Sequence, residues 1–304
     1  MFKTISLDKK FTKDKINSCI VAHKGSIVYE FYRNNKIKDK VQKLNSVTKS
    51  FISILIGIAI DQGKIEGVHQ SIADFFPNIN EAKKEITIEN LLTMTPGYDW
   101  PEFSSWGGRP FPMINSKDWV KFNLERIMVE SPGEKMYYNS GCSHLLSAIL
   151  QKATGLKLTE FAERYLFHPL GIREYEWHYD SKGIAIGGFG LSLKPGDLLK
   201  IGQLMLQNGQ WNNKRIISEP WVRTSTTAKY PTTYGFGYYG YHWWVMKDED
   251  KLMQPHTFHA MGYGGQYIMV VPDYDLVTIF TSDNYSDSYQ PILYFKNEII
   301  KSIL

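Results

Sequence analysis

The sequence has little of what marks several large classes of protein. Its 304 residues include only two cysteines, Cys19 and Cys142, and they form no C-x-x-C pair of the kind that binds zinc or carries out redox chemistry. We expect both thiols to be reduced and buried as small apolar groups. The 35 basic and 31 acidic residues nearly balance and form no long run of one sign. Binding to nucleic acid or to a membrane surface therefore has no support.

Long apolar runs and several functional motifs are also missing. The longest apolar run, residues 51–60, is far shorter than the ~18 residues that a membrane-spanning helix needs. The first residues are charged where a secretory signal is apolar, which predicts a soluble, cytoplasmic protein. There is no G-x-S-x-G, no phosphate-binding G-x-x-x-x-G-K, and no carboxylate near His256 and His259 to complete a zinc site. We expect no metal and no cofactor.

The remaining composition predicts a folded protein of one or two domains, because 43% of the residues are hydrophobic. Strand patterns occur at both ends: a hairpin around residues 23–26, and several strands after residue 235. Between them the pattern is helical, with helices that end at Gly63, Pro96, Gly155 and Gly209. We predict a discontinuous α/β domain, residues 1–45 plus 230–304, and an inserted, mainly helical region, residues 46–229.

Ser46 and Lys49 are the first candidates for chemistry. They form an S-x-x-K pattern, in which one helical turn brings a hydroxyl and an amine to the same face. A second match, Ser6 to Lys9, lies in a polar stretch, whereas Ser46 precedes FISILIGIAI, which is apolar on every side and is predicted to be buried at the domain interface. Burial lowers a lysine pKa toward neutrality and makes it a base for serine. The alternative is structural: Ser46 as a helix N-cap and Lys49 as a solvated residue.

The segments around this pair resemble a known family. In chain order they are SVTKSF, LLTMTPGY, PGEKMYYNSGCSHLLSAI, GFGLSLKPGDLLKIGQLMLQNGQW and MGYGGQYIMVVPDYDLVTIF. They lie within residues 20–285 and resemble the serine β-lactamases, penicillin-binding proteins and class C-like esterases and amidases. The resemblance implies an α+β, β-lactamase/transpeptidase-like fold, with an antiparallel sheet flanked by helices and an inserted, mainly helical region.

The resemblance also implies roles for single residues. Ser46 would be the nucleophile, with Lys49 and Tyr138 managing its proton, and the N–H groups of Ser46 and Tyr263 would form the oxyanion hole. Tyr138 is preferred to its neighbour Tyr137 because it lies six residues after Pro132, as in the family. A buried tyrosine with a purely structural hydroxyl is the alternative. Ser140 stands where the family more often has asparagine and is expected to bind substrate.

The third family motif, K-T-G or H-x-G, is altered. Ala260 and Gly262 occupy its first and last positions and are expected to contact the substrate. The Lys or His side chain of the family's first position is missing, because alanine stands there. His259 is one residue away, and strand alternation predicts that it faces the opposite side from Ala260. Arg109 could supply a positive charge from a loop, although nothing in the sequence places it. We therefore expect neutral esters to react faster than β-lactams or D-Ala-D-Ala peptides.

Two aromatic groups are candidate walls of the site. Trp100, Phe103, Trp106 and Phe111 lie in an irregular stretch of the kind that forms binding loops, and a second group, which includes Trp243 and Trp244, lies in residues 230–244. Ordinary packing is the alternative for both.

The leading prediction is a serine hydrolase acting on a small ester, amide or short peptide through a Ser46 acyl-enzyme. The alternatives are a penicillin-recognising β-lactamase or D-Ala-D-Ala carboxypeptidase, and a non-catalytic ligand-binding protein of the same fold.

Overall fold

Strands from both ends of the chain pair in one sheet. The computed structural model describes residues 7–232, 237–248, 251–252 and 255–303. Within these ranges one antiparallel sheet has the strand order β2-β1-β15-β14-β13-β10-β9-β8. Its strands are β1 (Ile16–His23), β2 (Ser26–Tyr32), β8 (Tyr230–Pro231), β9 (Tyr238–Tyr239), β10 (Trp244–Val245), β13 (Phe258–Gly262), β14 (Gln266–Val271) and β15 (Leu276–Ser282). The predicted hairpin is present, and its turn residues Lys24 and Gly25 both have positive φ, as a type I′ hairpin turn requires.

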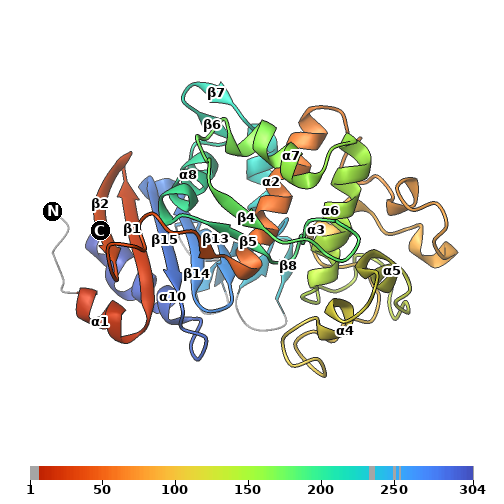
Figure 1. The fold of residues 1–304 in the computed structure, drawn as a ribbon, viewed down its shortest axis with the longest axis horizontal. Coiled ribbons are helices and arrows are strands. Elements are labelled where there is room, and N and C mark those ends of the chain that lie inside the picture. Colours follow the sequence, from red (N-terminus) through yellow and green to blue (C-terminus); the bar gives the residue numbers. More distant parts are fainter. Residues whose placement is uncertain (1–6, 233–236, 249–250, 253–254, 304) are drawn as a thin grey trace.

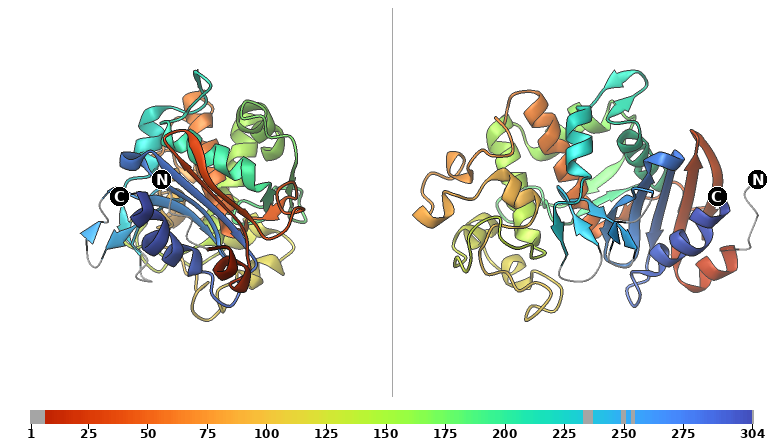
Figure 2. Two further views of the ribbon diagram at one scale, coloured as in Figure 1. Left: turned by 90° about the vertical axis from the view of Figure 1, so that its left-hand side faces the viewer. Right: turned by 180° about the vertical axis from the view of Figure 1, so that it is seen from behind.

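Helices cover both faces of this sheet (Figure 1). One face carries α1 (Leu7–Lys13) and the C-terminal segment α10 (Gln290–Tyr294), η6 (Phe295–Ile299) and α11 (Ile300–Ile303). The other face carries α8 (Pro195–Leu206), as the end-on view in Figure 2 shows. Gly202 lets α8 approach closely, because a Cβ there would lie 2.4 Å from Cγ1 of Val277 in β15. The sheet is therefore enclosed between two helical layers.

The middle of the chain is mainly helical, as predicted. Its helices are α2 (Thr48–Asp61), α3 (Ile88–Leu92), α4 (Phe111–Ile114), α5 (Trp119–Leu124), α6 (Ser140–Thr154), α7 (Leu158–Ala162), η4 (Glu163–Phe167) and α9 (Glu219–Ser225), with short turns η2 (Ile72–Asp74) and η3 (Glu81–Lys83). Small sheets that the sequence did not predict are β3 (Gln42–Lys43) with β5 (Leu191–Leu193) and β4 (Tyr175–Trp177), the pair β6 (Gln210–Trp211) and β7 (Lys214–Arg215), and the pair β11 (Lys247–Asp248) and β12 (Lys251–Leu252).

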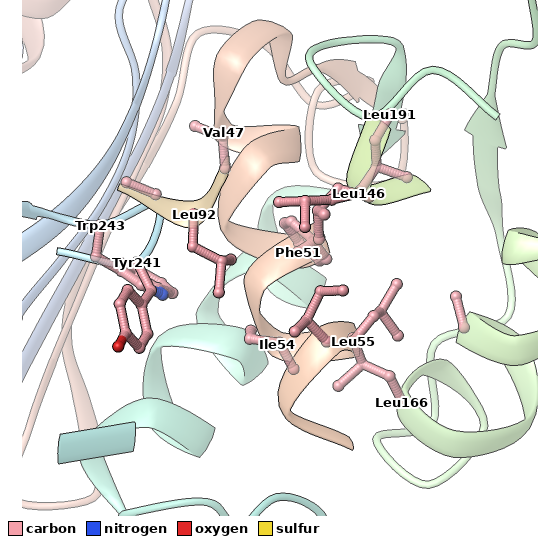
Figure 3. Close-up of a cluster of buried hydrophobic side chains, with 14 of the residues drawn as sticks. Val47, Phe51, Ile54, Leu55, Leu92, Leu146, Leu166, Leu191, Tyr241 and Trp243 are labelled. Atoms are coloured by element: carbon pink, nitrogen blue, oxygen red, sulfur yellow. The ribbon is translucent and has the colours of Figure 1, made fainter. Parts of the chain in front are cut away.

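Helix α2 lies between the sheet and the rest of the helical region (Figure 1). Every residue from Thr48 to Ala59 is buried, which confirms the prediction of a helix enclosed by protein. Figure 3 shows side chains of α2 gathered with those of neighbouring elements; the labelled partners include Leu92 of α3, Leu146 of α6, Leu166 of η4, Leu191 of β5, and Tyr241 and Trp243 before β10. A helix that is apolar all round is stable only when it is surrounded. This packing fixes the start of α2 relative to both parts of the chain.

These features confirm the predicted α+β class, with an antiparallel sheet flanked by helices. The division at residues 45 and 230 stays a prediction; α8 belongs to the inserted range and packs on the sheet. Cys19 in β1 and Cys142 in α6 are both buried free thiols, as expected. No helix in the described part of the chain is long and apolar enough to span a membrane.

Candidate active site

The turn that carries Ser46 is joined to the end of β13. Ser46 lies in a short 3-10 turn, η1 (Asn45–Val47), which leads directly into α2. The Nδ2–H of Asn45 donates a hydrogen bond to the backbone oxygen of Tyr263, 2.6 Å away. Gly262 permits this approach, because a Cβ there would lie 2.2 Å from the backbone oxygen of Leu44. The two segments whose N–H groups are the predicted oxyanion donors are thus held side by side.

The structural alternatives for the S-x-x-K pair are wrong. Ser46 caps no helix, since Leu44 is the N-cap of η1 and Val47 is the N-cap of α2. Lys49 is not solvated, because only 1% of its surface is exposed. Its Nζ lies 3.1 Å from Ser46 Oγ, 3.1 Å from Ser140 Oγ and 2.6 Å from the backbone oxygen of Gly188. Ser6 of the other match lies outside the described residues.

Burial changes the chemistry of Lys49. Desolvation lowers its pKa to about 8, against the opposing effects of the Glu102 carboxylate and of Cys142. At pH 7 about one such lysine in ten is neutral, compared with about one in three thousand for a lysine of ordinary pKa. A neutral amine within hydrogen-bond distance of a serine hydroxyl can accept its proton.

A buried carboxylate that sequence reasoning missed extends this network. Glu102 Oε1 accepts the hydroxyl of Ser140 at 2.7 Å, and Oε2 accepts the backbone N–H of Ser140 and the Nε1–H of Trp100, each at 2.8 Å. Ser140 is the first residue of α6, so the carboxylate lies at a helix N-terminus, where negative charge is favoured. In the sequence Glu102 lies in the irregular stretch 96–115, which also contains Asp99, and no spacing rule connects it to Ser140.

Tyr138, and not Tyr137, lies beside Lys49. The Nζ of Lys49 is 4.8 Å from the centroid of the Tyr138 ring, which also stacks on Trp244 of β10 with centroids 5.8 Å apart. Tyr137 is instead half-buried against Lys135, whose Nζ lies 4.9 Å from its ring centroid. This placement agrees with the preferred alignment, and the catalytic role of Tyr138 stays a prediction.

A cavity of about 1070 Å³ opens at Ser46. Six of the predicted site residues line it, namely Ser46, Arg109, Tyr138, Ser140, Gly262 and Tyr263. Its other walls include six aromatic side chains, from Phe103, Phe111, Phe189, Trp244, Tyr285 and Tyr289, and its charged lining residues are Lys43, Glu102, Arg109 and Asp287. A cavity of this size and lining suits a small organic molecule.

The predicted contact of Ala260 with substrate is wrong. Ala260 is fully buried, in the same core cluster as Val47 and Phe51, and it is not among the described residues that line the cavity. Its neighbours Met261 and Gly262 do line the cavity. Position 260 lies on the side of β13 that packs against η1 and α2, so its side chain points into the core.

Trp100 and Trp106 are also placed elsewhere than predicted. Their rings pack edge to face, with centroids 4.8 Å apart, and neither is among the described lining residues. A buried indole needs a partner for its N–H, and Trp100 has this partner in Glu102. Phe103 and Phe111, from the same stretch, supply the aromatic wall. Within the second aromatic group, residues 233–236 lie outside the described part of the chain, and Trp244 lines the cavity.

Of the two remaining candidates, Arg109 lies at the cavity, whereas His259 is buried and is not among the described residues that line it. Arg109 reaches the cavity, and its guanidinium lies 5.5 Å from the ring centroid of Tyr263. His259 lies on the other side of β13 from Ala260, as predicted, with its ring stacked on Trp244. Burial, with a smaller effect of Lys296, lowers the pKa of His259 to about 3, so it is a neutral buried imidazole at neutral pH.

Comparison with known proteins agrees with this geometry. A family model described as Beta-lactamase matches residues 18–294. The chain belongs to the beta-lactamase family. A curated relative, the 6-aminohexanoate-dimer hydrolase of Paenarthrobacter ureafaciens, is 22% identical over 296 residues, which cover 90% of this chain and 74% of that protein.

Solved structures of other proteins share the fold. EstCE1, described as a hydrolase with promiscuous acyltransferase activity, is 15% identical, with a TM-score of 0.78 over 98% of this chain and 96% of that chain. The class C beta-lactamase of Rhodobacter sphaeroides is 17% identical, with a TM-score of 0.73 over 98% of each chain. These similarities confirm the predicted β-lactamase/transpeptidase-like fold. The protein is thus a member of a hydrolase family with amidase-type and esterase-type neighbours.

Proposed function

We propose that the protein is a serine hydrolase that cleaves a small ester or amide through an acyl-enzyme on Ser46. The observation that carries this proposal is the buried Lys49 Nζ, 3.1 Å from Ser46 Oγ, with Ser46 open to the cavity. A serine is a weak nucleophile by itself and needs an adjacent base. Lys49 meets that need because burial brings its pKa to about 8.

Acylation begins when the Lys49 amine takes the Ser46 proton and Oγ attacks the substrate carbonyl. Negative charge then develops on the carbonyl oxygen, where the N–H groups of Ser46 and Tyr263 are the proposed donors. The proton passes from the Lys49 ammonium to the leaving alcohol or amine as its bond to carbon breaks. The acyl group remains on Ser46 Oγ.

Deacylation repeats these steps with water as the nucleophile. The amine accepts a proton from water, the water oxygen attacks the acyl carbon, and Ser46 leaves and regains its proton. We assign Tyr138 as the second proton carrier, because its ring lies against Lys49 and lines the cavity. A phenol in this position can give a proton to the leaving group and take one from water.

The proposed substrate is a small molecule with an apolar acyl or leaving group, since eight aromatic side chains line the cavity. On β13, the cavity meets the apolar side chain of Met261 and the backbone of Gly262. A substrate carboxylate would find no cation on this strand. Neutral esters are therefore expected to react faster than β-lactams or D-Ala-D-Ala peptides.

Covalent labelling tests the nucleophile. A fluorophosphonate should label the wild-type protein at Ser46, and Ser46→Ala should lose both the label and the turnover of p-nitrophenyl acetate. Loss of one half-buried hydroxyl costs at most ~1–2 kcal/mol, so the variant should still fold. Ser50→Ala, one helical turn further along α2, is the matched control and should keep the label.

Each other outcome contradicts a part of the proposal. A label on a different residue would refute Ser46 as nucleophile. Absence of both label and turnover in the wild-type protein would favour the ligand-binding alternative. Faster hydrolysis of nitrocefin than of any neutral ester in a p-nitrophenyl series would favour a penicillin-recognising enzyme and refute the substrate argument.

A further inference from the structure

We infer that Glu102 is a positioning residue for Lys49, which acts through the hydroxyl of Ser140 to aim the lone pair of the Lys49 amine at Ser46. The inference rests on the proposed function, since it concerns how the base of that reaction is oriented. Glu102, Ser140 and Lys49 form one hydrogen-bonded network, in which each residue is at most 3% exposed.

The direction of the Ser140 hydroxyl is set by Glu102. A carboxylate only accepts hydrogen bonds, and Oε2 is already occupied by two N–H groups, from Ser140 and Trp100. These two bonds fix the carboxylate so that Oε1 faces the Ser140 hydroxyl at 2.7 Å. The hydroxyl proton therefore points to Glu102, and Ser140 Oγ has only lone pairs to offer to Lys49.

The direction of the Lys49 lone pair follows. Lys49 Nζ has three oxygen neighbours, and two of them, Ser140 Oγ and the backbone oxygen of Gly188, can only accept from it. A neutral amine has two N–H bonds, and both are used here. Its one lone pair must then point along the third direction, toward Ser46 Oγ at 3.1 Å. The amine is thus oriented to receive the Ser46 proton without a rotation.

The charge of Glu102 acts on the same amine. The titratable neighbours of Lys49 are Glu102, Cys142 of α6, His242 before β10 and the Tyr138 ring. Burial raises the pKa of Cys142 and lowers that of His242 to about 3, so both are neutral at neutral pH. Among these groups the Glu102 carboxylate therefore raises the Lys49 pKa against the larger effect of burial. Removing the charge should lower that pKa further.

Glu102→Gln is the sharpest perturbation. The two N–H donors at Oε2 require the amide oxygen there, so the amide nitrogen must take the place of Oε1 and donate to Ser140. The Ser140 hydroxyl proton then turns toward Lys49 and competes for its lone pair. We expect kcat on p-nitrophenyl acetate to fall at least about tenfold with KM little changed. The acid limb of kcat/KM should move to lower pH, which a purely structural role would not cause.

A double-mutant cycle shows whether Glu102 acts through Ser140. Ser140→Ala should also lower kcat, and adding Glu102→Gln to it should lower kcat by less than about threefold more. Glu125→Gln, at an exposed ion pair with Lys121, is the matched control and should change neither kcat nor the acid limb. Ser140→Ala removes the same relay, so it carries the test if Glu102→Gln does not fold.

The outcomes separate this inference from the proposed function. An unchanged kcat and acid limb in Glu102→Gln, or additive effects in the cycle, would overturn the inference while leaving Ser46 as nucleophile. A wild-type protein that neither reacts with fluorophosphonate nor hydrolyses esters would overturn the proposed function. In that case the Lys49 pKa can still be measured by NMR of protein whose lysines carry ¹³C at Cε. The Lys49 pKa should be lower in Glu102→Gln than in the wild-type protein, and an equal pKa would refute the inference.

Discussion

Lys49 couples the candidate site to the stability of the whole protein. Below about pH 8 it carries a proton in both the folded and the unfolded chain, so folding must bury a charge. Between pH 8 and 10.5 only the unfolded chain keeps that proton, and the free energy of unfolding should therefore rise with pH. For pKa values of 10.5 unfolded and about 8 folded, the Lys49 contribution should rise by about 2.5 kcal/mol from pH 7 to pH 10.

The variant Lys49→Met isolates this contribution, because methionine has a similar length and no charge. Urea unfolding of both proteins at pH 7, 8, 9 and 10 gives the difference in unfolding free energy at each pH. Buried groups with raised pKa values, such as Cys19 and Tyr267, titrate in both proteins and largely cancel in the difference. The variant also loses three hydrogen bonds of Nζ, so the prediction concerns the change of this difference with pH and not its value at one pH.

Two results would refute the reasoning. Parallel stability curves would mean that Lys49 keeps an ordinary pKa in the folded protein, and the argument for a neutral amine base would fail. If instead the advantage of the wild-type protein decreased as the pH rose, the Lys49 pKa would be raised, and the Glu102 carboxylate would outweigh burial.

The remaining predictions concern the second proton carrier and the approach of η1 to β13. Tyr138→Phe should lower kcat/KM on p-nitrophenyl acetate by ~10²-fold or more, whereas Tyr137→Phe should change it by less than about twofold; the reverse order would show that the alignment is shifted by one residue. Gly262→Ala should lower the free energy of unfolding by ~1–3 kcal/mol in urea, because its Cβ would overlap the Leu44 carbonyl. Gly67→Ala, where a Cβ meets no atom within 4 Å, is its control, and equal losses in the two variants would contradict the packing argument.

The sequence predicts those features that a local pattern encodes. A run that is apolar on every side must be enclosed, and α2 is buried from Thr48 to Ala59. One helical turn between Ser46 and Lys49 is enough to bring hydroxyl and amine within reach. The choice of Tyr138 over Tyr137 followed from counting along the chain, and the structure places Tyr138 beside Lys49.

Features that depend on tertiary contacts were not predictable in this way. Glu102 and Ser140 meet because an irregular loop folds over the start of α6, and neither residue carries a periodic signal. The same loop explains the wrong prediction for Trp100, since its large ring is buried and its N–H anchors Glu102. Tyr285 and Tyr289, which also line the cavity, come from the segment after β15 and belong to no motif.

The third motif shows which features of a site strand alternation can predict and which it cannot. Alternation correctly places His259 and Ala260 on opposite sides of β13, but it does not tell which side faces a cavity. That depends on η1, which meets the end of β13 at Gly262 and leaves Met261 and Gly262 at the opening while Ala260 packs in the core. A cation at position 260 would therefore lie among apolar side chains, where an unpaired charge is strongly disfavoured. Recognition of a charged substrate group must instead come from cations elsewhere at the cavity, such as Lys43 of β3 and Arg109, whose guanidinium already lies over the Tyr263 ring.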